Sequence, residues 1–271
     1  MKSSLKLCVV FCLLGLFACS SSAKKPDGKT VKIAISTSMG DIEVELYDQT
    51  PKHRDNFVNL VKDGYFDGLL FHRVIKEFMI QAGDPDSKNA QPGAHLGVGG
   101  PGYTVPAEFV PELIHRRGAL SAARQGDNMN PEKASSGSQF YIVQGKIFTD
   151  DELNQIESQV TMGKAQPLFM QYIREESEAA KAAGQTVDQQ AIQEKAKVRA
   201  MEWVQNNPYK MPEERRAVYK TEGGTPHLDD AYTVFGQVTK GLDIVEKISL
   251  VPTDAAARPA EDVRIIKMKI K

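Results

Sequence analysis

The stretch FHRVIKEFMIQAGD, residues 71–84, decides how this chain folds. Two short apolar runs flank a charged step at its centre, a pattern that predicts two strands joined by a tight turn. Arg73 lies within the first apolar run, where burying a cation is costly unless it has a polar partner or a functional role. Gln81, one strand later, is the candidate partner, and Phe78 and Met79 are candidates for an apolar wall. The alternative is a structural arginine held in a hydrogen-bonded network, and this stretch alone leaves both interpretations open.

Composition bounds the possible functions. The chain has 271 residues, enough for one large domain or two small ones. Its net charge of -1 and the lack of a basic stripe give no reason to expect a nucleic-acid partner. All three cysteines (Cys8, Cys12 and Cys19) fall in the first twenty residues, so no disulfide or thiol chemistry is expected in the folded part. The histidines show no metal-ligand spacing, so neither a metal nor a cofactor is expected.

Residues 97–102 match the glycine pattern of dinucleotide-binding loops, but the surrounding sequence argues against that function. No apolar strand leads into the glycines, no helical pattern follows them, and Pro101 lies inside the motif. We therefore interpret this segment as a loop whose backbone packs closely.

Residues 1–18 predict a lipoprotein signal peptide. The segment starts with positive charge and continues with an apolar run too short to span a bilayer comfortably. A small residue before Cys19 resembles the bacterial lipobox, in which the cysteine is lipidated and becomes the mature N-terminus. Residues 19–29 would then tether residues 30–271 to a membrane surface in the bacterial envelope (periplasm). The alternative is an ordinary secretory signal cleaved at a nearby alanine, and both predict export.

The remaining pattern is mostly that of short strands. Apolar and polar residues alternate at 30–36 and 41–46, and further strands are expected at 118–123, 138–143, 232–238 and 263–270. Two helices are expected, one from the N-cap Thr50 and Pro51 to Gly64, the other over 241–249. About eight strands with two helices fit a sandwich or a closed barrel, and the pattern alone does not choose between them.

Residues 149–222 differ in character and predict a helical insertion in the β-rich host. Thr149 and Glu152 form a capping-box pattern, and apolar residues follow at helical spacing. A second helical stretch predicts an αα-hairpin, and a short helix starts near Pro212. Three roles stay open for this insertion: a chaperone or protein-binding surface with the barrel as platform, a cover over the pocket of the host domain, and an inert addition to the barrel.

The stretch at 71–84 resembles the signature of the cyclophilins, the peptidyl-prolyl cis-trans isomerases. Four later blocks match the family in the same order: GVGGPGYTVPAEF at 97–109, GALSAA at 118–123, SSGSQFYI at 135–142 and HLDDAYTVFGQV at 227–238. One block would be weak evidence, but five in order are strong. The resemblance covers roughly residues 30–147 and 225–271 and leaves the insertion outside.

This resemblance implies a mainly β fold, an eight-stranded antiparallel closed barrel capped by two helices. It implies isomerisation of X-Pro bonds in unfolded or flexible proline-containing polypeptides, with Arg73 as the catalytic arginine and Gln81 orienting it. The positions that match the family's substrate-binding residues are Phe78, Met79, Ala123, Arg124, Gln139, Tyr141, His227, Leu228 and Tyr232.

An arginine suits this chemistry. Rotation about a peptide bond meets a barrier of about 18–20 kcal/mol because the nitrogen lone pair is conjugated with the carbonyl. In the twisted state that lone pair becomes an acceptor, and a permanently charged donor such as Arg73 interacts more strongly with the twisted state than with the planar one.

Four positions depart from common family patterns. Tyr141 replaces a Phe, Arg124 stands where many members have Asn, and His227 stands where eukaryotic members have Trp. Tyr232 stands where eukaryotic members have His. None of these changes removes the arginine or the glutamine, so we expect activity to persist. Cyclosporin binding is expected to be poor because that inhibitor depends on the Trp position.

Overall fold

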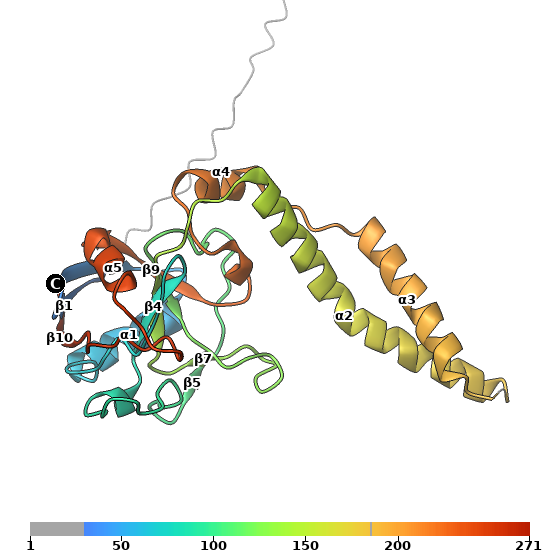
Figure 1. Ribbon diagram of the computed structural model, residues 1–271, viewed down its shortest axis with the longest axis horizontal. Helices are drawn as coiled ribbons and strands as arrows, with labels where there is room; N and C mark the ends of the chain where they lie inside the picture. The colour runs from blue at the N-terminus through green and yellow to red at the C-terminus, as the bar shows by residue number, and fades with distance from the viewer. Residues whose placement is uncertain (1–29, 185) are drawn as a thin grey trace, which may run out of the picture.

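The computed structural model of the protein describes residues 30–184 and 186–271. The predicted signal peptide (1–18), the tether (19–29) and Cys19 lie outside these residues. The described chain forms a rounded β-rich body from which a pair of long helices projects (Figure 1). Within the described ranges, no helix is both long enough and apolar enough to span a bilayer.

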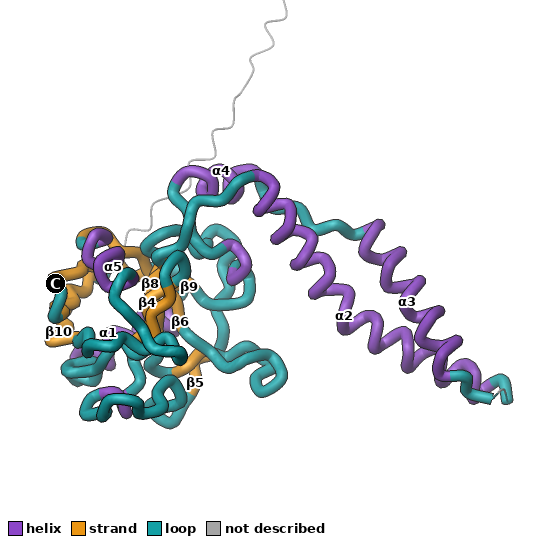
Figure 2. The backbone as a smooth tube through the Cα atoms, viewed as in Figure 1, coloured by secondary structure: helices purple, strands orange, loops and turns teal. Residues whose placement is uncertain are grey.

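Eight antiparallel strands form the main sheet in the order β10-β1-β2-β9-β6-β8-β4-β3. Figure 2 draws the strands in orange within the β-rich body. Apolar and polar residues alternate along the first two strands, as expected for strands with one face in a core. The strands are β1 (Lys32–Thr37), β2 (Gly40–Leu46), β3 (Arg73–Ile75), β4 (Met79–Ala82), β6 (Ala119–Ala122), β8 (Phe140–Val143), β9 (Val234–Lys240) and β10 (Ile265–Ile270).

The two ends of the sheet meet, which makes it a barrel. The chain just before β3 pairs with the chain at the start of β10 through an antiparallel bridge between Leu70 and Arg264. The Phe71 N–H donates to the Val263 carbonyl at 2.9 Å, and the Ile265 N–H donates to the Leu69 carbonyl at 2.8 Å. These contacts bring the two edges of the sheet together. The predicted eight-stranded antiparallel barrel is confirmed, and the sandwich is excluded.

Two helices cover the barrel and complete its core. Phe57 of α1 (Pro51–Lys62) packs edge-on against Phe140 of β8, with ring centroids 5.3 Å apart. Val245 and Ile248 of α5 (Leu242–Ser249) join the same buried cluster. The barrel interior is therefore filled with side chains, and a ligand site has to lie on its outside.

The start of α1 corrects one sequence prediction. Thr50 precedes the helix as expected, but its side chain makes no capping hydrogen bond. Instead, the Glu108 carboxylate accepts hydrogen bonds from the N–H groups of Lys52 at 3.1 Å and His53 at 3.0 Å. A carboxylate at a helix N-terminus is favoured by the helix dipole. A residue distant in sequence thus caps this helix and fixes the loop after β5.

The irregular region after β4 contains short elements that periodicity did not predict. They are η1 (Pro85–Ser87) and a two-stranded ribbon of β5 (Thr104–Val105) and β7 (Ser135–Ser136). The fully buried carboxylate of Asp84 accepts hydrogen bonds from the N–H groups of Asp86 and Gly97. This carboxylate holds the following loop in place.

The predicted helical hairpin is present. The capping box of Thr149 and Glu152 opens α2 (Asp150–Ala182), whose 33 residues span about 50 Å. Its outer half packs against α3 (Gln189–Asn206) and extends away from the barrel (Figure 1). The chain then returns through α4 (Glu213–Thr221), which lies beside the barrel, and η2 (Pro226–Leu228).

Candidate active site

The β3–β4 hairpin places Arg73 directly opposite Gln81. Directly opposed residues of an antiparallel pair project their side chains from the same face of the sheet, so these two side chains meet. The Arg73 Nη1 donates a hydrogen bond to Gln81 Oε1 at 3.1 Å. Among the described residues, Gln81 is the one side chain hydrogen-bonded to this guanidinium, and no carboxylate lies within 4.0 Å of it. Its other N–H donors are therefore available to a ligand.

A second amide fixes the orientation of Gln81. The Gln81 Nε2 donates to Gln139 Oε1 at 3.0 Å, and the Gln139 Nε2 donates to the Gly99 carbonyl at 2.8 Å. Because the amide nitrogens of Gln81 and Gln139 both donate hydrogen bonds in this series, the Gln81 side-chain oxygen faces Arg73. Gln81 thus fixes the position of the Arg73 guanidinium, and Gln139 fixes the position of Gln81.

Arg73 borders a cavity of about 580 Å³. Nine predicted residues line this cavity: Arg73, Phe78, Met79, Gln81, Ala123, Arg124, Tyr141, Leu228 and Tyr232. The buried side chains of Met79, Tyr141 and Leu228 provide an apolar wall. The Arg73 guanidinium carbon lies 5.9 Å from the centroid of the Phe78 ring. A charged donor and an apolar surface therefore face the same space.

Two predicted binding residues do not line the cavity. Gln139 lies behind Gln81, where it acts through the hydrogen bond already described. His227 is exposed, with its ring centroid 5.5 Å from that of Phe78 at the outer side of the site. Their predicted contact with substrate stays a prediction.

The family model of cyclophilin type peptidyl-prolyl cis-trans isomerase/CLD matches residues 30–201 and 217–270. The chain belongs to this family. A Staphylococcus haemolyticus protein named "Putative peptidyl-prolyl cis-trans isomerase" is 32% identical over 252 residues, which cover 92% of this chain and 95% of that protein. The chain is thus a cyclophilin-type isomerase, as its five sequence blocks predicted.

Further comparisons are consistent with this family and fold. A Streptococcus pyogenes protein named "Putative bifunctional phosphatase/peptidyl-prolyl cis-trans isomerase" is 33% identical over 245 residues; they cover 88% of this chain but only 38% of that longer protein. The crystal structure of a cyclophilin type isomerase from Cryptosporidium parvum superposes with a TM-score of 0.52. It is 22% identical, and the match covers 90% of this chain and 98% of that one.

A second arginine lines the cyclophilin pocket but is engaged by the protein. The Arg124 guanidinium lies 4.4 Å above the Tyr232 ring, and its Nε donates to the Ala231 carbonyl at 2.7 Å. Its Nη1 donates to Asp127 Oδ1 at 2.6 Å. Arg124 therefore joins two loops at the pocket, whereas Arg73 keeps donors free.

Part of the pocket was missed by sequence reasoning. Residues 93–98 and the loop at Asp254, Ala256 and Arg258 also line it. The Val74 N–H donates to the Ala257 carbonyl at 2.8 Å, which brings this late loop beside Arg73. No local pattern indicates such a contact, because it depends on barrel closure.

None of the described residues within 149–222 lines the pocket, so the insertion contributes nothing to its wall. The expected role of the insertion as a cover over the pocket stays a prediction. A metal site also finds no support in the described part of the chain, where no three His, Cys, Asp or Glu side chains form a group that could hold an ion.

His72 lines the pocket yet is only 4% exposed, and its ring nitrogens have no hydrogen-bond partner among the described side chains and backbone. Burial lowers the pKa of His72 to about 4, although the nearby Asp84 carboxylate favours the charged ring. The histidine is therefore neutral in the folded protein at neutral pH.

We expect acid to destabilise the protein through His72. Between pH 6.5 and pH 4 the unfolded chain binds a proton at this histidine and the folded chain does not, so stability falls as the pH falls through this range. The loss at pH 4 amounts to about 3 kcal/mol. Urea unfolding at pH 7 and pH 4.5 should show a clearly smaller difference for His72→Gln than for wild type. His95→Gln, at an exposed histidine, is the control, and equal pH differences for wild type and His72→Gln would refute the assignment.

Proposed function

We propose that this cyclophilin accelerates isomerisation of X-Pro bonds in exported polypeptides, with Arg73 stabilising the twisted imide. The observation that carries the proposal is the half-buried guanidinium of Arg73, held by Gln81 beside an apolar pocket with donors left free. A structural arginine sealed into its own network would have no open cavity beside it.

The mechanism follows from charge and shape. The proline ring would occupy the apolar wall of Met79, Tyr141 and Leu228, and the imide nitrogen would face Arg73. As the bond twists, its nitrogen becomes an acceptor and the guanidinium donates to it, so the interaction is strongest in the transition state. A solved structure of the Cryptosporidium parvum isomerase in the presence of the dipeptide Ala-Pro is consistent with a proline-containing occupant.

Removing the guanidinium should abolish most of the activity. We expect Arg73→Ala to lower kcat/KM for a proline tetrapeptide about 100-fold, because an electrostatic donor at the reacting atom is lost. Arg73→Lys should retain an intermediate rate, since it keeps the charge without the planar fork. The measurement is a coupled isomerisation assay, with circular dichroism to verify folding.

The matched control for Arg73→Ala is Arg174→Ala, at an exposed arginine on α2. Equal rates for Arg73→Ala and wild type would remove Arg73 from the mechanism.

The cellular site is part of the same proposal. The resemblance of the first residues to a lipoprotein signal, with Cys19 as the lipidated residue, supports attachment to a membrane of the bacterial envelope.

We expect Cys19→Ala to move the protein from the membrane fraction to the soluble fraction, because the lipid attachment site is lost. The measurement is fractionation of cells that express the full chain, followed by immunoblotting, with Cys12→Ala as the control. An unchanged membrane fraction for Cys19→Ala would contradict lipidation at this residue.

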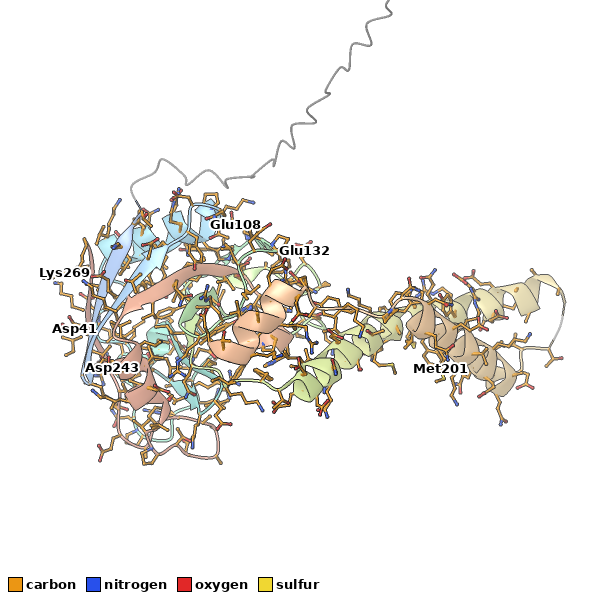
Figure 3. All side chains as sticks on the ribbon, turned by 90° about the horizontal axis from the view of Figure 1, so that it is seen from above. Asp41, Glu108, Glu132, Met201, Asp243 and Lys269 are labelled. Atoms are coloured by element: carbon orange, nitrogen blue, oxygen red, sulfur yellow. The ribbon has the colours of Figure 1, made fainter. Side chains whose placement is uncertain are left out.

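Exposed apolar side chains on the projecting hairpin favour a second function, binding of unfolded chains. Met162 and Met170 of α2 are each 58% exposed. Met201 of α3, labelled in Figure 3, is 55% exposed. Val198 lies one helical turn from Met201 and is also half exposed. Methionine adapts its shape to varied apolar partners, as a surface for unfolded polypeptides requires.

The triple variant Met162→Gln/Met170→Gln/Met201→Gln separates the two functions. Its suppression of the aggregation of a denatured client, followed by light scattering, should fall at least twofold, because the apolar contact surface is lost. Tetrapeptide isomerisation should be unchanged. The control is Lys164→Gln/Lys195→Gln/Lys197→Gln on the same hairpin; equal loss in both triples would argue against the methionines.

A further inference from the structure

A chain of buried hydrogen bonds connects helix α4 to the pocket wall. The Tyr219 hydroxyl of α4 donates to Asp229 Oδ2 at 2.6 Å. The other oxygen of Asp229 lies 3.0 Å from His115 Nδ1, and the His115 Nε2 lies 3.0 Å from the Tyr141 hydroxyl. Tyr219 and His115 are fully buried, and Tyr141 is 4% exposed. Tyr141, at the end of this series of hydrogen bonds, lines the active-site cavity.

The chemistry of the groups assigns the protons along this chain. An ionised carboxylate can only accept, so the His115 Nδ1–H donates to Asp229; in the tautomer that carries its proton on Nδ1, Nε2 is an acceptor. The Tyr141 hydroxyl then donates to Nε2. Burial raises the pKa of the hydroxyls of Tyr141 and Tyr219, which keeps both of them protonated donors.

The position of Tyr141 matters for the reaction centre. It stands opposite Gln81 in the β4–β8 pair, next to the partner of Arg73. Its ring stacks on His115 with centroids 6.1 Å apart and meets the Tyr232 ring edge-on at 6.1 Å. A shift of this ring would therefore change the pocket wall beside the reacting bond.

Helix α4 is fixed tightly to this part of the barrel. The Phe148 N–H donates to the Tyr219 carbonyl at 3.0 Å, and the Thr225 N–H donates to the His115 carbonyl at 2.8 Å. Gly224 allows this close approach: it has a φ of +154°, and a Cβ there would lie 2.2 Å from the His115 carbonyl oxygen. The end of the insertion is thus joined to the strand region that carries the pocket.

We propose that His115 is a positioning residue for the proline pocket: it holds Tyr141 in place, and helix α4 holds His115 through Asp229 and Tyr219. The insertion thereby supports the active site from behind without lining it. This inference rests on the proposed isomerase function, because its effect is read in catalysis.

A double-mutant cycle tests the contact. His115→Phe keeps a ring but removes the His115 acceptor of the buried Tyr141 hydroxyl, so kcat/KM for a proline tetrapeptide should fall about tenfold, mainly through KM. Tyr141→Phe removes that hydroxyl. In the double variant His115→Phe/Tyr141→Phe, kcat/KM should recover to within about threefold of Tyr141→Phe alone. The same cycle is followed by urea unfolding, which does not depend on activity.

His53 is a matched control because it is also buried between a carboxylate and a hydroxyl. Its Nδ1 lies 2.7 Å from Glu108 Oε2, and its Nε2 lies 2.9 Å from Ser135 Oγ, outside the pocket. The effect of His53→Phe on kcat/KM should be the same with and without Tyr141→Phe. Tyr219→Phe, which removes only the donor from α4, should lower kcat/KM about threefold and lose this effect in the Tyr141→Phe background.

The outcomes separate this inference from the proposed function. If the wild-type protein shows no rate enhancement, the proposed function fails and this inference fails with it. If wild type is active and His115→Phe has equal effects in the two backgrounds, only the positioning role is overturned. Recovery in the double variant supports it.

Discussion

The site depends on one hydrogen bond, from Arg73 Nη1 to Gln81 Oε1 across the β3–β4 hairpin. This bond exists because the antiparallel register puts the two residues directly opposite each other. A slip of one residue would turn the arginine to the other face of the sheet, where the buried core would have to accept a charge. Strand register and the geometry of the proposed active site therefore depend on the same pairing of residues in this part of the molecule.

Closure of the barrel supplies the rest of the pocket. The cavity brings together β3 and β4, the loops at 93–98 and 254–258, the chain after β6, and the segment after η2. Two carboxylates hold neighbouring loops: the buried Asp84 accepts from the N–H of Gly97, and the partly buried Glu108 caps helix α1. Polar groups that make all their hydrogen bonds inside a protein hold the backbone around them rigidly. Irregular loops can therefore form a pocket of defined shape.

The insertion has two physically different parts. Its outer hairpin of α2 and α3 extends away from the barrel and exposes methionines, while its inner end is tied to the barrel by charged and hydrogen-bonded contacts (Figure 1). At the inner end, the Tyr219 hydroxyl donates to Asp229, and Arg215 donates to Asp230 and to the Pro111 carbonyl. One inserted segment can therefore support the pocket at its base and present a separate surface along its projecting helices.

Local sequence determined most of the elements. The alternation at residues 30–46, the capping box of Thr149 and Glu152, and the short apolar runs of residues 71–84 each encode structure within a few residues, and the structure contains all of them. The pairing of Arg73 with Gln81 was also predictable, because a hairpin's register follows from its own turn. The choice of a barrel came from family resemblance, since strand count alone fits a sandwich equally well.

Tertiary structure decided what no local pattern encodes. The sequence predicts Thr50 as the cap of α1, but Glu108 accepts the hydrogen bonds from the first N–H groups of the helix. Glu108 is in place because the loop after β5 folds back onto α1. The loop at 254–258 reaches Arg73 only through barrel closure, and His115 meets Tyr141 and Asp229 only because distant segments pack together. Such contacts depend on the three-dimensional path of the chain, whereas propensity and periodicity act between neighbours in sequence. The sequence by itself thus determined the strands of the main sheet, the main helices and the arginine. The fold alone decided what surrounds that arginine and what holds its pocket in place.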